Sequence, residues 1–279
     1  MLYLVFVFGL IFGSFLNVVI YRLSPALRQA QGGVFGGRRS ACPHCKTVLR
    51  WYDLVPVFSF FWLRRRCHYC GGNISWQYPI VEILSGFTWV GVFYQSFNNG
   101  NLRLLNFEIL KFLNIETFNL LNLLNILNFF YYIFIFSSLL VIAVYDFKWQ
   151  IIPDKIVYPA IIIALMYTMF SAFEFSNFEI FTYRNIEMFI WPLFTAAAAF
   201  IFFFLIWFFS RGRAMGLGDA KLGFLIGLFL GPLYSTIAFT LSFIIGAAFG
   251  ILLVVCKEKS WKSQIAFGPF LVIGVFIAF

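Results

Sequence analysis

Charged residues are scarce in this chain of 279 residues: Asp and Glu number 11, His numbers 2, and Asp, Glu, Lys and Arg together make up 11% of the sequence. Hydrophobic residues account for 62% of it and are gathered in long runs. A helix needs about 20 apolar residues to cross the hydrocarbon core of a bilayer. The composition therefore excludes a soluble globular protein and indicates a polytopic membrane protein.

The apolar runs predict an all-α protein with about eight transmembrane helices. Six runs are clear, and a seventh segment, 79–97, tolerates Glu82 near one end; the six lie at 2–21, 128–145, 155–173, 188–209, 222–256 and 264–279. The run at 222–256 is too long for one span, and Gly231-Pro232 in its middle is a turn signal that divides it. We expect the first run to be an uncleaved span, because no basic residue precedes it and no small-residue cleavage site comes before Arg22.

Basic residues are distributed unevenly between the two sides of this topology. If the N-terminus faces outside, every Lys and Arg except Arg103, Lys111 and Arg184 falls in an inner segment. The net charge of +9 is explained by this bias and requires no nucleic-acid partner. Residues 22–78 then form a cytoplasmic domain, and the polar stretch 98–127 is expected to be a partly helical connection on the outer side.

Cysteine is also sparse, yet four of the five residues form two C-x-x-C pairs, CPHC at 42–45 and CHYC at 67–70. Two such pairs match a tetrahedral zinc site with four thiolate ligands, which would be Cys42, Cys45, Cys67 and Cys70. A basic, inward-facing segment argues against disulfides, and a structural zinc would staple a domain too small to bury its own core. A redox pair or metal-free thiols are the alternatives. His44 and His68 are possible substitute ligands, and Cys256 is expected to be a buried thiol.

The scarcity of acids makes the position of each one informative, and three aspartates lie at the ends of apolar runs: Asp146, Asp154 and Asp219. Carboxylates at the membrane edge are functional candidates by default. Two aspartates brought together across helices can share a proton and activate a water for peptide hydrolysis. Asp219 lies in MGLGDAKLG at 215–223, where glycines would allow close approach of a substrate and free the side chain from a fixed helical position. The alternative is that Asp219 pairs with Lys221 or caps the following helix.

Five motifs in order resemble one known family. They are FGSFLNVVIYRL at 12–23, CPHCKTVLRWYDLVPVFSF at 42–60, CHYCGGNISWQYPIVE at 67–82, DFKWQIIPD at 146–154 and MGLGDAKL at 215–222. Together they resemble the prepilin peptidases, or type IV leader peptidases, which are bifunctional peptidase and N-methyltransferase enzymes of bacteria. The resemblance covers nearly the whole chain.

The resemblance implies cleavage of a basic leader from prepilins or pseudopilins after a glycine, followed by methylation of the new N-terminus from S-adenosylmethionine. It assigns catalysis to Asp146 and Asp219 as an intramembrane aspartyl pair and leaves Asp154 outside that pair. The organisation it implies is a first transmembrane helix at 1–21, a cytoplasmic tetracysteine domain at 22–78 as the methyltransferase region, and a transmembrane peptidase domain at 79–279. The site would face the cytoplasm in the bacterial inner membrane, with pilin substrates and lipid as partners; the sequence leaves the oligomeric state open.

Two departures from the family pattern lie in the region associated with methyl transfer. Arg65 and Arg66 precede Cys67, where many members have a glycine and a basic residue, and Gln77 stands where many have arginine. A peptidase without methyltransferase activity is therefore an alternative. Two other classes are an ion-coupled carrier that uses the three aspartates as a relay, although no internal repeat is evident, and a zinc-stapled scaffold without catalysis.

Overall fold

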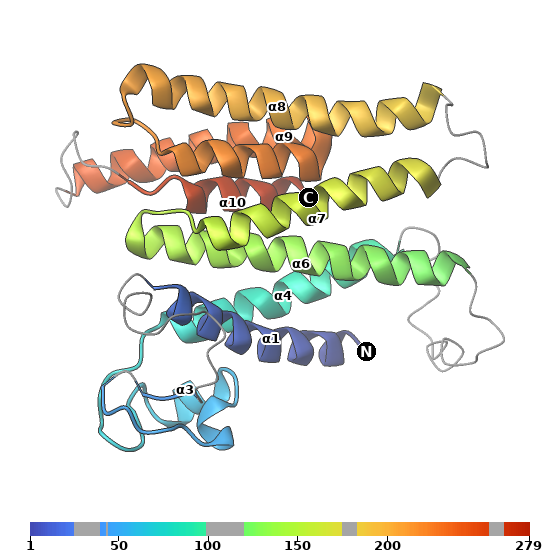
Figure 1. The fold of residues 1–279 in the computed structure, drawn as a ribbon. Helices are drawn as coiled ribbons and strands as arrows, with labels where there is room; N and C mark the ends of the chain where they lie inside the picture. Colours follow the sequence, from blue (N-terminus) through green and yellow to red (C-terminus); the bar gives the residue numbers. More distant parts are fainter. Residues whose placement is uncertain (25–39, 43, 99–119, 175–182, 257–264) are drawn as a thin grey trace. The chain divides into compact units, whose positions relative to one another are not determined.

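The computed structural model describes residues 1–24, 40–42, 44–98, 120–174, 183–256 and 265–279. Over these residues the chain is helical, with two isolated β-bridges. Figure 1 shows the helices, which are α1 (Leu2–Leu23), the 3-10 helix η1 (Trp51–Leu54), α3 (Phe58–Trp62), α4 (Gln77–Asn98), α6 (Leu120–Trp149), α7 (Asp154–Glu174), α8 (Tyr183–Ser210), α9 (Leu217–Val255) and α10 (Gly268–Ala278). The predicted all-α fold is confirmed.

Among the described residues, five helices are long and apolar enough to cross a membrane, namely α1, α6, α7, α8 and α9. Helix α10 is shorter, and α4 covers the predicted segment 79–97 without being among the five. Within α9, Gly231 has φ 68 and ψ −172, so the helix breaks between 217–230 and 232–255 as the Gly-Pro pair predicted. Most of the polar stretch 98–127 lies outside the described residues.

The chain divides into two compact units, residues 1–137 and 138–279, and the division falls within α6. In unit 1, α1 packs against α4 through small residues. A Cβ at Gly9 would lie 2.8 Å from the Gly86 Cα, and one at Gly13 would lie 2.6 Å from the Glu82 Cα. The two helices therefore run antiparallel with their backbones in close contact, which is how helices pack in lipid.

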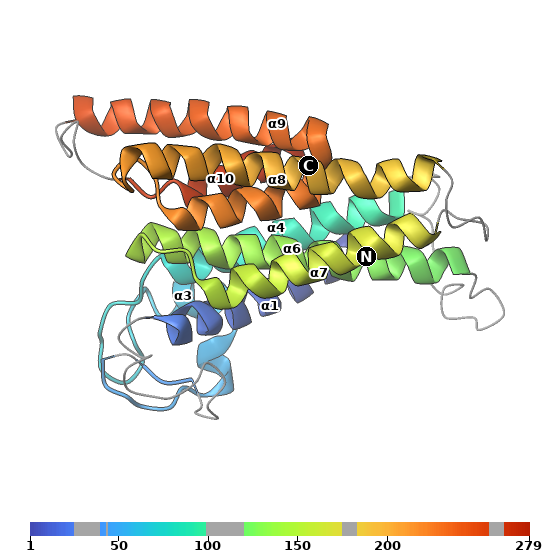
Figure 2. The same cartoon turned by 45° about the horizontal axis from the view of Figure 1, so that its top comes forward.

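Unit 2 contains α7 to α10 and the last turns of α6, and its helices α8, α9 and α10 pack closely (Figure 2). Gly227 of α9 lies against α8, since a Cβ there would be 2.8 Å from the Ala196 Cα. The Phe203 ring is fully buried and fills the space beside Gly223. Large apolar side chains are exposed on the outside of the unit, as expected for a surface that meets lipid.

Candidate active site

Asp146 lies in the last turn of α6, and its side chain is 5% exposed. Its Oδ2 accepts a hydrogen bond from the backbone N–H of Gly268, the first residue of α10, at 3.0 Å. The backbone N–H of Gln150, which has a φ of 53, donates to the carbonyl of Asp146 at 2.7 Å and ends the helix. The carboxylate is thus fixed from a segment 122 residues further along the chain.

Asp219 lies in the first turn of α9, and its side chain is 7% exposed. Its Oδ2 accepts a hydrogen bond from the backbone N–H of Gly216, the N-cap residue, at 3.1 Å. The expectation that the flanking glycines free Asp219 from a fixed helical position is wrong, because Gly218 and Asp219 are both helical. The alternative prediction, that Asp219 caps the helix, agrees with this hydrogen bond, because it joins the Asp219 side chain to the N-cap residue.

The two aspartates belong to the same unit, and the segment that follows Asp146 packs against the first turn of α9, because Ile152 lies beside Gly218. Among the described residues neither carboxylate takes part in an ion pair. Two buried carboxyl groups without a cationic partner favour sharing one proton over ionising together. The geometry therefore suits acid-base chemistry, in which one group accepts a proton while the other donates one.

The connection from α6 to α7 and the first turn of α7 both contact the start of α9. A Cβ at Gly218 would lie 2.9 Å from the Cβ of Ile152, so only glycine fits there without a shift. Lys221 Nζ lies 2.7 Å from Asp154 Oδ1 and 5.0 Å from the centre of the Tyr158 ring. Lys221 therefore pairs with Asp154. The alternative prediction, in which Lys221 pairs with Asp219, is wrong.

Gly268 is a site residue that sequence reasoning missed. A Cβ there would lie 2.6 Å from Asp146 Oδ2, so any larger residue would collide with the carboxylate. Pro269 follows at the start of α10, and a Gly-Pro pair opening the last apolar run was the available sequence signal. The contact between Gly268 and Asp146 joins two segments that are 122 residues apart, so no local sequence pattern reveals it.

A hollow of about 470 Å³ lies between α7, α8 and α9, with Leu217, Lys221 and Phe224 on its α9 side. Asp219 is two residues from both Leu217 and Lys221, which places it on roughly the opposite face of the helix, since successive residues are about 100° apart. This hollow is therefore not a cleft leading to the aspartates.

The four predicted cysteine ligands are brought together in unit 1, and their sulfur atoms all lie within 4.8 Å of one another. The two pairs have matching backbones: the N–H of Cys42 donates to the carbonyl of Thr47 and that of Cys67 to the carbonyl of Gly72, at 3.0 and 2.8 Å. Positive φ values at Lys46 and Gly71 turn each loop. The group could hold a metal ion, and neither histidine belongs to it.

The donor set suits zinc. Four thiolates at about 2.3 Å from a tetrahedral zinc lie about 3.8 Å apart, and Cys42 Sγ is 4.0 Å from Cys70 Sγ. Hydrogen bonds from the side chain and backbone of Thr47 lower the pKa of Cys45 to about 6. Backbone hydrogen bonds from Tyr69 and Cys70 lower the pKa of Cys67. Lowered thiol pKa values favour the thiolate form that a metal requires at Cys45 and Cys67. Despite a backbone hydrogen bond from Gly72, desolvation and the neighbouring sulfur atoms instead raise the pKa of Cys70 to about 11, as expected where several thiols crowd together. Cys256, expected to be buried, is exposed at the end of α9.

The two positions that depart from the family pattern have definite local roles. Arg65 has a φ of 63, a backbone conformation that suits glycine, and its guanidinium lies 5.4 Å from the centre of the Trp76 ring. The Gln77 side chain donates to Asn17 Oδ1 at 3.3 Å and so joins α4 to α1. Neither the contact of Arg65 with Trp76 nor that of Gln77 with Asn17 involves a cysteine sulfur.

The described chain is thus an all-α, polytopic membrane protein that carries a pair of buried aspartates in one unit and a four-cysteine group in the other. Two models of known families match it: the bacterial Peptidase A24 N-terminal domain over residues 7–96, and the type IV leader peptidase family over residues 133–251. The chain belongs to the type IV leader peptidase family.

Relatives match along almost the entire chain. The prepilin leader peptidase/N-methyltransferase of Dickeya chrysanthemi is 29% identical, over 95% of this chain and 87% of the relative. The protein of the same name from Legionella pneumophila is also 29% identical, over 97% and 88%. That of Aeromonas hydrophila is 27% identical, over 99% and 89%. No solved structure matches the chain.

Proposed function

We propose that this protein is a prepilin peptidase that removes the basic leader of type IV prepilins or pseudopilins, with Asp146 and Asp219 as its catalytic pair. The observation that carries the proposal is that two buried aspartates of the same unit, at the end of α6 and the start of α9, lie on segments that pack together at Ile152 and Gly218 and have no cationic partner among the described residues. Relatives named prepilin leader peptidase/N-methyltransferase support the choice of substrate.

In this mechanism one aspartate is ionised and the other carries a proton. The ionised carboxylate accepts a proton from a water, whose oxygen adds to the scissile carbonyl carbon. The protonated partner donates to the carbonyl oxygen, which becomes a hydroxyl in the tetrahedral intermediate. When this intermediate collapses, the C–N bond breaks and the leaving amine takes the proton that the first aspartate accepted from water. A hydroxyl of the intermediate returns its proton to the second aspartate as the C=O bond re-forms. No covalent intermediate with the enzyme is formed.

Backbone hydrogen bonds position each carboxylate for these steps. Gly268 N–H donates to Oδ2 of Asp146, and Gly216 N–H donates to Oδ2 of Asp219. One oxygen of each carboxylate is therefore occupied, and the other oxygen of each is the candidate for contacting water or the scissile carbonyl. This arrangement supports direct proton transfer better than a transport relay, because each group is fixed at a helix end.

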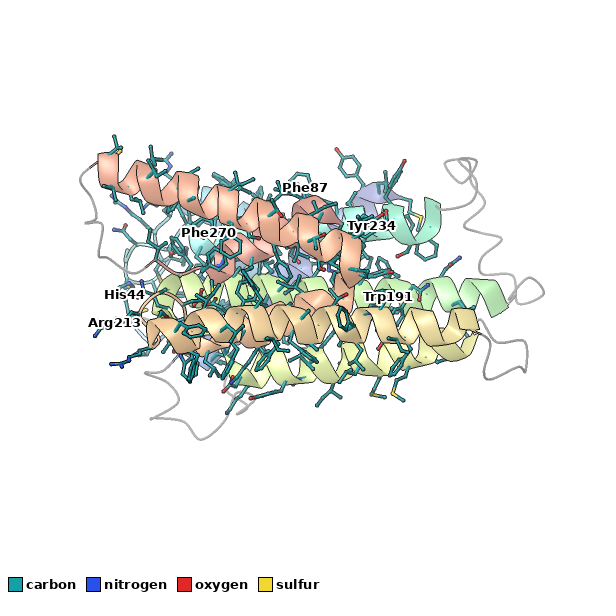
Figure 3. The ribbon with its side chains drawn as sticks, turned by 90° about the horizontal axis from the view of Figure 1, so that it is seen from above. His44, Phe87, Trp191, Arg213, Tyr234 and Phe270 are labelled. Carbon is teal, nitrogen blue, oxygen red and sulfur yellow. The ribbon has the colours of Figure 1, made fainter. Side chains whose placement is uncertain are left out.

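The site is proposed to face the cytoplasm, with the N-terminus on the outer side. Basic residues support this orientation, because Arg211 and Arg213 lie in the connection between α8 and α9, at the same end of unit 2 as the aspartates. Arg213, in the connection between α8 and α9, points away from the helices at one end of the unit, whereas Trp191 lies on α8 away from that end (Figure 3). A basic, cytoplasmic leader would meet the site there.

We also propose that the protein N-methylates the new N-terminus. S-adenosylmethionine, when bound, supplies the methyl group, and the tetracysteine domain is the expected region for this activity. Cys42, Cys45, Cys67 and Cys70 would hold a structural zinc that keeps both loops folded. The names of the relatives support methyl transfer, and the four clustered sulfur atoms support zinc.

The test uses full-length protein in detergent or nanodiscs with a prepilin from the same genome. Mass spectrometry follows cleavage just before the apolar helix of the prepilin. The assay compares the wild type with Asp146→Asn and Asp219→Asn. Asp154→Asn is the matched control, because Asp154 lies outside the proposed pair. Loss of cleavage in the first two variants alone supports the assignment, whereas a fully active Asp219→Asn or Asp146→Asn protein refutes it. Labelled methyl transfer to a pre-cleaved pilin peptide tests the second activity separately.

A further inference from the structure

The short helix α3 in unit 1 presents an unusual set of exposed aromatic side chains. Its sequence is FSFFW, and Phe58, Phe61 and Trp62 are 62%, 58% and 75% exposed. The rings of Phe58 and Trp62 stack on one another with their centres 5.7 Å apart. Only Phe60 of this helix is buried, against Trp76. A surface with three large aromatic rings facing outward marks a contact site.

The backbone on both sides of α3 is held in conformations that favour glycine. Val57, just before the helix, has a φ of 60, and Arg64 and Arg65, just after it, have φ values of 50 and 63. None of these residues is glycine, so the surrounding structure must impose the conformation, and such imposed conformations cluster at functional places. The backbone at both ends of α3 is therefore fixed by the surrounding fold.

The buried carboxylate of Glu82 fixes the position of α3 along the axis of the membrane helix α1. The backbone N–H of Val57 donates to Glu82 Oε2 at 2.7 Å, and Glu82 of α4 packs against Gly13 of α1. Gly13 lies nine residues before Arg22, or roughly 13 Å along the helix axis. Because helical side chains tilt towards the N-terminus of their own helix, Glu82 reaches back towards the end of α1 that carries Arg22. Figure 1 accordingly draws α3 beside the C-terminal part of α1.

The exposed aromatic rings are followed directly by positive charge. Arg64, Arg65 and Arg66 are all exposed, and Arg65 lies over the ring of Trp76, the residue that precedes α4. Residues 54–81 contain no Asp or Glu. An aromatic surface beside the C-terminal half of a membrane helix, with an adjacent cationic corner, matches the boundary between acyl chains and negatively charged headgroups.

We infer that Phe58, Phe61, Trp62, Arg64 and Arg66, here called the α3 anchor, bind anionic phospholipid at the inner membrane surface. The aromatic rings enter the interface while the arginines contact phosphate. The tetracysteine domain then lies against the membrane and does not project from it. The basic leader of the proposed substrate is not the occupant, because its charge has the same sign as the anchor.

The experiment uses the full-length protein in bilayers that mix phosphatidylglycerol and phosphatidylcholine, with the bromine quencher placed on one lipid or the other at equal mole fraction. Subtracting the emission of Trp62→Phe from that of the wild type isolates the signal of Trp62. We expect stronger quenching when phosphatidylglycerol carries the bromine. Replacing Arg64 and Arg66 by glutamine should reduce the preference on the order of fivefold per arginine.

Arg213→Gln is the matched control, because it removes one exposed charge from the connection between α8 and α9 and leaves both the anchor and the cysteine loops intact; the lipid preference of Trp62 in this variant should equal that of the wild type. Trp191, exposed on the membrane helix α8, serves as the positive control for quenching. Zinc content of each variant verifies that the domain is folded. Unquenched Trp62 in every bilayer would show that it meets water or protein, and equal quenching by both lipids would show no recognition of anionic headgroups; either result overturns the inference.

Discussion

Replacing Gly268 by alanine should disable the peptidase while leaving the helices in place. The new Cβ would lie 2.6 Å from Asp146 Oδ2, whereas ordinary contact begins near 3.4 Å, so the carboxylate or the start of α10 must move by roughly 0.8 Å. The movement also weakens the 3.0 Å hydrogen bond from Gly268 N–H. A hydrogen bond to a charged group contributes about 1.5–3 kcal/mol, and a misplacement of about 1 Å can cost on the order of 100-fold in rate. We expect kcat to fall on the order of 100-fold.

The assay is time-resolved cleavage of a full-length prepilin in nanodiscs at saturating and limiting substrate, so that kcat and KM are obtained separately. KM should change less than kcat, because the substitution displaces a reacting group and not a binding surface. Gly250→Ala is the benign control, since a Cβ there would meet only the Ile265 Cδ1 at 3.7 Å. A Gly268→Ala protein with the kcat of the wild type would refute the claim that this contact positions Asp146.

Three further predictions concern other parts of the chain. Asp154→Asn and Lys221→Met should each lower stability by less than about 1 kcal/mol, because the pair is partly exposed, and in thermal unfolding a charge-swapped double variant should be more stable than either Asp154→Lys or Lys221→Asp alone. Removing zinc with a chelator should lower methyl transfer and the thermal stability of unit 1 while prepilin cleavage persists. Loss of both activities in parallel would contradict the prediction that zinc serves only the methyltransferase region. Gly231→Ala should destabilise the protein by about 1–3 kcal/mol, because φ 68 with ψ −172 suits only glycine; thermal unfolding beside Gly91→Ala, whose Cβ would meet nothing within 4 Å, measures this.

Features that depend on local sequence could be predicted. The apolar runs predicted the helices, because the backbone N–H and C=O groups of a segment in lipid must form hydrogen bonds within that segment. Gly231-Pro232 predicted the break in α9, since no other residue pair there disrupts the helix so strongly. The spacing of the C-x-x-C pairs predicted that four sulfur atoms would gather, because each pair fixes one edge of a tetrahedron.

Features that depend on tertiary contacts could not be predicted. Gly268 and Asp146 are 122 residues apart, and Lys221 and Asp154 are 67 apart, so no periodicity relates them. The exposure of Cys256 was misjudged because an apolar run does not reveal which face of its last turn meets the unit. Asp219 was expected to be free of the helix, but glycine at positions 216 and 218 serves helix capping and close packing against Ile152 instead.

The distribution of the two groups along the chain has an evolutionary consequence. Both aspartates, with the backbone donors that fix them, lie within residues 138–279, and all four clustered cysteines lie within residues 1–137. The contacts that fix the aspartates and those that gather the cysteines therefore share no residue, and a substitution at one group leaves these contacts of the other in place. Variation at the two groups can accumulate separately, although α6 runs through the boundary between the two units and ties them into one chain.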